Sequence, residues 1–164
     1  MNHGLRHDTH TARIWLLAGG LTVGLLDLAF AWGFWAPRGA SLGGILRSIA
    51  AGWFGAQSRD MGATGAWVGL VSHLGIALAF VVAYWLAARR VALLRSAWLP
   101  CGLAYGVLLY AVMNLVVLPL SAAGAPTFDD VAWVASSIVM HAVFGALCAW
   151  FARRALAATP GAAG

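Results

Sequence analysis

Four apolar runs dominate the sequence, and each is long enough to cross a lipid bilayer as one helix. They cover residues 14–36, 63–88, 99–118 and 131–152. About 20 apolar residues in helical conformation span about 30 Å of hydrocarbon. Hydrophobic residues make up 62% of the chain and charged residues 9%, whereas soluble domains carry about 25% charged residues. The sequence therefore predicts an all-α integral membrane protein with four transmembrane helices in a bundle.

The arginines predict how the chain is oriented. All ten basic residues are arginine, and seven of them lie before the first run, between the second and third, or after the fourth: Arg6, Arg13, Arg89, Arg90, Arg95, Arg153 and Arg154. Cytoplasmic loops carry the excess of arginine and lysine, so both termini are expected in the cytoplasm. The net charge of +5 then reflects arginines beside lipid headgroups, and no nucleic-acid partner is expected.

These boundaries divide the chain into three parts. Residues 1–13 are predicted to form a cytoplasmic N-terminal tail, residues 14–154 the transmembrane domain, and residues 155–164 a disordered cytoplasmic tail. The first apolar run resembles a signal peptide, with a basic start and a small-residue "AFA". We interpret it as a retained helix because Asp27 lies just ahead of that site and the apolar run continues beyond it.

A shorter amphipathic segment, residues 41–55, lies between the first two runs. In "SLGGILRSIAAGWFG" the apolar residues recur at helical spacing, and Ser41 is suited to cap the helix. The segment is too short to span, so we expect it at the outer face, either resting on lipid or touching protein. Arg47, Trp53 and Phe54 are its candidate interface residues.

Each long run combines small residues at three- or four-residue spacing with one strongly polar group. The four stripes are Gly20, Gly24 and Asp27; Gly65, Gly69 and His73; Gly102, Gly106, Tyr110 and Asn114; and Ser137, His141 and Gly145. Small residues let helices approach closely. The stripes are therefore predicted to converge, and Asp27, His73, Asn114 and His141 to meet in the outer half of the bundle.

This polar core has three interpretations. It could hold the helices together by hydrogen bonds, or form a proton or small-ligand site of a small permease or accessory subunit. As the alternative, His73 and His141 could be the two axial ligands of a b-type haem. No motif of a hydrolase, nucleotide-binding enzyme or zinc enzyme is found, so we expect no enzyme, no catalytic residues and, outside the haem alternative, no cofactor or metal. A homo-oligomer or a membrane partner subunit is a further hypothesis.

Three stretches, "ILRSIAAGWFG", "CGLAYGVLLYAVMNLVVLPLS" and "HAVFGALCAWFARR", carry a family resemblance together with Asp27 and His73. They resemble an uncharacterised family of small four-helix bacterial inner-membrane proteins. The resemblance covers most of the chain from Gly20 to Arg154, and Arg47 stands where the family has glutamine. It implies a bacterial inner membrane and the same four-span layout, and it implies no particular activity.

Overall fold

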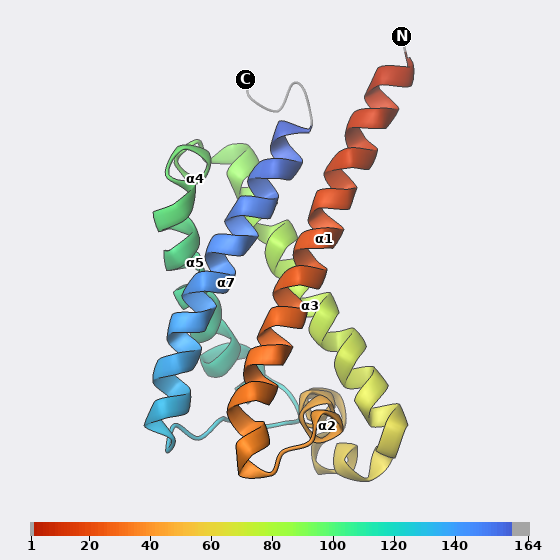
Figure 1. Cartoon of the computed structure of the whole chain (residues 1–164), viewed down its shortest axis with the longest axis vertical. Coiled ribbons are helices and arrows are strands. Elements are labelled where there is room, and N and C mark those ends of the chain that lie inside the picture. Colours follow the sequence, from red (N-terminus) through yellow and green to blue (C-terminus); the bar gives the residue numbers. More distant parts are fainter. Residues whose placement is uncertain (1, 159–164) are drawn as a thin grey trace.

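The computed structural model describes residues 2–158 and is helical along nearly all of that length (Figure 1). Its elements are α1 (Asn2–Trp35), α2 (Leu42–Phe54), α3 (Gly62–Arg90), α4 (Leu93–Ser96), α5 (Trp98–Val112), α6 (Leu118–Leu120) and α7 (Val131–Ala157). Short 3-10 helices at Ala36–Arg38 and Gly55–Met61 flank α2, and a π-helical turn at Met113–Val117 joins α5 to α6. The prediction of an all-helical chain is confirmed for the described residues, which include no strand.

Four stretches of helix are long and apolar enough to cross a membrane, as the sequence predicted. They are His10–Arg38, Leu42–Arg90, Trp98–Leu120 and Val131–Ala157, and the second includes α2 as well as α3. Helix α1 begins and helix α7 ends at the same end of the molecule, which we call the terminal end (Figure 1). The opposite end holds α2, and we call it the α2 end. The four long helices therefore suggest a multi-pass membrane protein.

The long helices are joined through α7, which contacts α1, α3 and α5. The α5–α7 approach is the closest, because a Cβ atom at Gly106 would overlap the backbone of His141. Near the terminal end α3 and α5 also meet, and the Tyr105 hydroxyl donates to the Phe80 carbonyl oxygen at 2.9 Å. Toward the α2 end the ribbons of α3 and α5 diverge (Figure 1).

The glycine stripes make close helix contacts, but not all of them face the same interior. Gly20 and Gly24 of α1 lie against α3, as expected. Gly69 of α3 instead lies against Leu46 of α2, and Gly65 lies against the preceding 3-10 helix and Arg47 of α2, so the expectation that this stripe faces the bundle interior along its whole length is wrong. The physical reason is helical drift, because each four-residue step turns the direction of the side chain by about 40°. Two such steps turn His73 away from α2 and toward α1.

Helix α2 packs across α3 instead of resting on lipid alone. Leu46 and Ala50 on its apolar face are buried. The Trp53 indole N–H donates to the Ser72 hydroxyl of α3 at 2.9 Å. The predicted cap is confirmed, since the Ser41 hydroxyl accepts from the Gly44 N–H at 3.1 Å. The loop that follows α6 is fastened to the same helix, where the Ala122 N–H donates to the Gly52 carbonyl at 3.0 Å.

The third span, expected as one helix over residues 99–118, is interrupted by the π-helical turn. Leu118 directly follows this turn, and its N–H donates to the Met113 carbonyl oxygen five residues back. Pro119 follows at once and has no N–H to donate, which disturbs the regular ladder of hydrogen bonds. The helix resumes for Leu118–Leu120 and ends at Ser121.

Both segments predicted as tails contain helix. Helix α1 begins at Asn2, so residues 2–13 are continuous with the helix of the first span, and no proline interrupts them. Helix α7 continues through Ala157, so the segment predicted to be disordered begins with three helical residues, and alanine and leucine are strong helix formers. Residues 159–164 lie outside the described residues. At the start of α7, the Asp130 carboxylate accepts from the Trp133 N–H at 2.9 Å and caps the helix.

Candidate functional site

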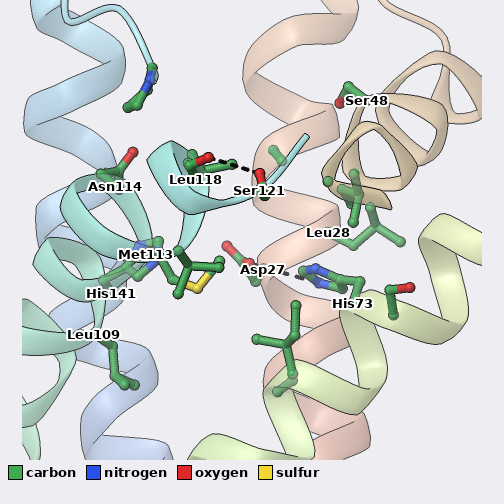
Figure 2. A pocket seen from close by; sticks show the side chains of 18 of the residues that line it. Asp27, Leu28, Ser48, His73, Leu109, Met113, Asn114, Leu118, Ser121 and His141 are labelled. Atoms are coloured by element: carbon green, nitrogen blue, oxygen red, sulfur yellow. Dashed lines mark hydrogen bonds and ion pairs between the residues drawn. The ribbon is translucent and has the colours of Figure 1, made fainter. Parts of the chain in front are cut away.

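A cavity of about 750 Å³ lies near the α2 end, where α3 and α5 diverge. Its walls come from α1, α2, α3, α5, the π-helical turn, α6 and α7, with the loop after α6 at one side (Figure 2). Most of the lining is aromatic or aliphatic, including Trp35, Ile49, Phe80 and Phe144. The four residues predicted to form a polar core, Asp27, His73, Asn114 and His141, all line this cavity. They surround a space instead of filling the centre of the molecule.

Asp27 and His73 face each other from α1 and α3 (Figure 2). Their Oδ2 and Nε2 atoms are 3.7 Å apart, and the side chains are 28% and 15% exposed, respectively. The same Nε2 atom lies 2.9 Å from the Gly24 carbonyl oxygen. A carbonyl oxygen only accepts, so Nε2 carries a hydrogen and donates it to Gly24. In the neutral ring the lone pair is therefore on Nδ1, and Asp27 receives no short hydrogen bond from His73.

His141 of α7 has the opposite tautomer. Its Nδ1 atom lies 2.8 Å from the Ser137 carbonyl oxygen, so Nδ1 carries the hydrogen of the neutral ring and Nε2 carries the lone pair. The rings of Tyr110 and Phe144 meet the imidazole edge-on, with centroids 5.3 and 5.9 Å away. In the view of Figure 2, Asp27 lies between His73 of α3 and His141 of α7. The two imidazoles and the carboxylate therefore come from three different helices.

Asn114 lies in the π-helical turn, and its amide bonds its own helix. The Nδ2 atom donates to the Tyr110 carbonyl oxygen at 2.9 Å. The same carbonyl also accepts from the Met113 N–H, so the Asn114 amide adds a second bond to a backbone oxygen beside the irregular turn. Asn114 therefore bonds within its own helix while it lines the cavity.

The three candidate residues of the amphipathic segment have different positions. Trp53 lines the cavity through its contact with α3, although 69% of its surface is exposed. Arg47 is half-buried beside Gly65, outside the cavity lining. Phe54 is exposed. Only Trp53 of the three therefore contributes to the site.

Sequence reasoning missed the hydroxyl groups that line the cavity. They belong to Ser48 of α2, Ser72 of α3 and Ser121 at the end of α6. Ser121 donates to the Leu118 carbonyl at 2.8 Å (Figure 2). Ser72 stands directly before His73, and Ser121 ends the "LPLS" stretch, so each lies beside residues already singled out in the sequence. Ser48 had none, because the cavity it faces forms only when α2 packs on α3.

A haem held between the Nε2 atoms of the two histidines would require a change at His73. Iron ligation needs a nitrogen lone pair. The Nε2 atom of His73 carries a hydrogen that is donated to Gly24, so the lone pair of the neutral ring is on Nδ1. Among the described residues, no group of three or more His, Cys, Asp or Glu side chains is arranged to hold a metal ion. The arrangement suits an apolar molecule with one polar or charged group.

Known proteins provide no assignment for this site. Comparisons with models of protein families, with curated proteins and with solved structures find no match. The chemistry of the site therefore follows from its own residues.

Proposed function

We propose that the chain is a multi-pass protein of a bacterial inner membrane and that its cavity binds a small ligand, with Asp27 as a proton site. We propose no enzymatic activity for it. The four long apolar helices support membrane insertion. The arginines at the terminal end, from Arg13 to Arg154, outnumber those near α2, which supports cytoplasmic termini. The cavity then lies in the outer half of the membrane.

One observation carries the choice of a binding site over a purely structural role. If the polar residues held the helices together, their hydrogen bonds would cross from helix to helix. His141 and Asn114 bond carbonyls of their own helices, and only His73 bonds another helix, through the Gly24 carbonyl. The polar groups therefore line a space more than they join its walls.

The size and composition of the cavity also support ligand binding. Small-molecule sites are concave, largely apolar spaces of about 300–1,000 Å³ with a few polar groups. The cavity has about 750 Å³ and mostly apolar walls. An ionisable side chain deep in a membrane costs at least about 2.5 kcal/mol, and such residues mark pathways, proton sites or ligand counter-ions.

Two matched compounds can test this function. Methyltriphenylphosphonium and triphenylphosphine oxide share three phenyl rings around phosphorus and differ in charge. We expect at least one of them to bind the purified protein saturably in lipid nanodiscs, measured by equilibrium dialysis. Ala31 lines the cavity, so Ala31→Phe should fill part of the space and abolish binding. Ala29 is exposed and lies outside the lining, so Ala29→Phe is the control and should bind normally.

Absence of saturable binding of both compounds would contradict the proposed function. Equal binding by the wild-type protein and Ala31→Phe would also contradict it, because the compounds would then bind elsewhere. The small-permease and accessory-subunit roles, and a homo-oligomer or membrane partner subunit, stay predictions that this experiment does not address.

A further inference from the structure

We propose that the ligand is a lipophilic monocation, an apolar molecule with one positive charge, and that it competes with a proton for Asp27. This inference rests on the proposed function of the cavity and adds the charge class of the ligand. It follows from the charges that face Asp27, from the walls of the cavity, and from the hydrogen bonds of the two histidines.

The titratable groups around Asp27 are few. His73 faces it from α3, and His141 lines the same cavity from α7. The polar lining residues from α2, the π-helical turn and the end of α6 do not titrate in the ordinary range: Ser48, Trp53, Asn114 and Ser121. Among the described residues, no arginine lines the cavity and Asp27 is the only acidic residue that does. Within the described part of the chain, any positive charge at the cavity would have to come from an imidazole.

Both imidazoles are satisfied in their neutral forms. Each neutral ring has one N–H, and each donates it to a backbone carbonyl, His73 to Gly24 and His141 to Ser137. The 3.7 Å separation between His73 and Asp27 is longer than a hydrogen bond. With neutral histidines and an ionised Asp27, the cavity carries one negative charge that no hydrogen bond from His73 neutralises. A proton or a bound cation would neutralise this charge.

The walls select among cations. Trp35, Trp133, Phe80 and Phe144 present aromatic rings to the space, and aromatic faces attract organic cations. A metal ion would need several oxygen or nitrogen ligands at short distance, and no such cluster exists among the described residues. An anion would meet the carboxylate without a compensating arginine. A monocation with an apolar body matches both the charge and the walls.

Competition with protons gives the proposal its test. One carboxylate cannot both hold a proton and balance a cation, so the cation should bind less tightly as the pH is lowered. We expect methyltriphenylphosphonium to bind at least tenfold more tightly than triphenylphosphine oxide at about pH 8. This preference should shrink as the pH is lowered stepwise to about 4. Binding of the uncharged oxide should change little, which controls for a general effect of pH on the fold.

Asp27→Asn removes the charge with little change in shape, and it should abolish both the preference for the cation and its pH dependence. Asp60→Asn is the matched control, because Asp60 is exposed and outside the cavity, and it should bind as the wild type does. If Asp27→Asn does not fold, the pH series on the wild-type protein gives the answer by itself.

The outcomes separate this inference from the function on which it rests. If both compounds bind equally at every pH and Ala31→Phe abolishes both, the cavity binds ligands but the cation class is wrong. Retention of the preference in Asp27→Asn would show that another group attracts the cation. If neither compound binds, the proposed function itself fails.

Discussion

Replacement of Gly69 by alanine tests how α2 is held on α3. A methyl group at this position would lie 2.7 Å from the Leu46 carbonyl carbon and 3.3 Å from its Cα atom, and closer still to the carbonyl oxygen. Ordinary van der Waals contact begins at 3.4 Å. The obstacle is backbone, which cannot rotate aside as a side chain can. Helix α2 would have to move away by about 1 Å or more, and overpacking of this kind costs about 1–3 kcal/mol.

Gly75 provides the control in the same helix. A methyl group there meets no atom within 4 Å, so Gly75→Ala changes only the intrinsic helix propensity. That change favours the helix by up to about 1 kcal/mol at either position. The difference between the two variants therefore isolates the clash with α2. We expect Gly69→Ala to be less stable than Gly75→Ala by about 1–3 kcal/mol.

The measurement is equilibrium unfolding of the purified proteins in mixed micelles with increasing sodium dodecyl sulfate, followed by tryptophan fluorescence. Gly69→Ala should also weaken binding of methyltriphenylphosphonium, because Ile45 and Ile49 of α2 line the cavity and would move with the helix. Equal stability of the two alanine variants would refute the reasoning. It would mean that α2 does not pack against α3 at Leu46.

Two further predictions concern topology and cofactor. The first uses a protein whose native cysteines are replaced by serine. In it, Ala125→Cys should react with a membrane-impermeant maleimide added to intact spheroplasts, whereas Ala92→Cys should react only after lysis. The reverse pattern would show that the proposed orientation is wrong. The protein purified in mild detergent should show no Soret band, oxidised or reduced, because iron ligation through the His73 Nε2 atom would break its hydrogen bond to Gly24. A band that is lost in both His73→Ala and His141→Ala would instead establish haem ligation.

The features that the sequence predicted well depend on local chemistry. The four helices follow from the length of the apolar runs, since few other conformations satisfy the backbone of such runs in lipid. Ser41 caps the helix that follows it because its side-chain oxygen reaches an N–H only three residues ahead. Neither feature requires knowledge of what lies elsewhere in the chain.

The features that the sequence could not predict depend on which surfaces meet. A row of glycines shows that another backbone comes close, but not which one, and Gly69 meets Leu46 of α2 instead of a spanning helix. The four polar residues could be assigned to one region by depth. Whether they contact each other or surround a cavity depends on the divergence of α3 from α5, which no single helix encodes. Of the two hydrogen bonds that fix the histidine tautomers, the one from His73 also depends on how the helices pack, because the Gly24 carbonyl that accepts it lies on another helix.

The π-helical turn at Met113–Val117 has a consequence for any helical-wheel diagram of the third span. Such a turn accommodates one residue more than an α-helical turn, and one residue corresponds to about 100° of rotation. The part of the span before Met113 and the part after Val117 are therefore out of phase, so a single wheel drawn through both assigns the later residues to the wrong face. Removal of one residue from this turn would bring the two halves back into phase. It would also rotate Leu118 and Ser121 away from the position they have now.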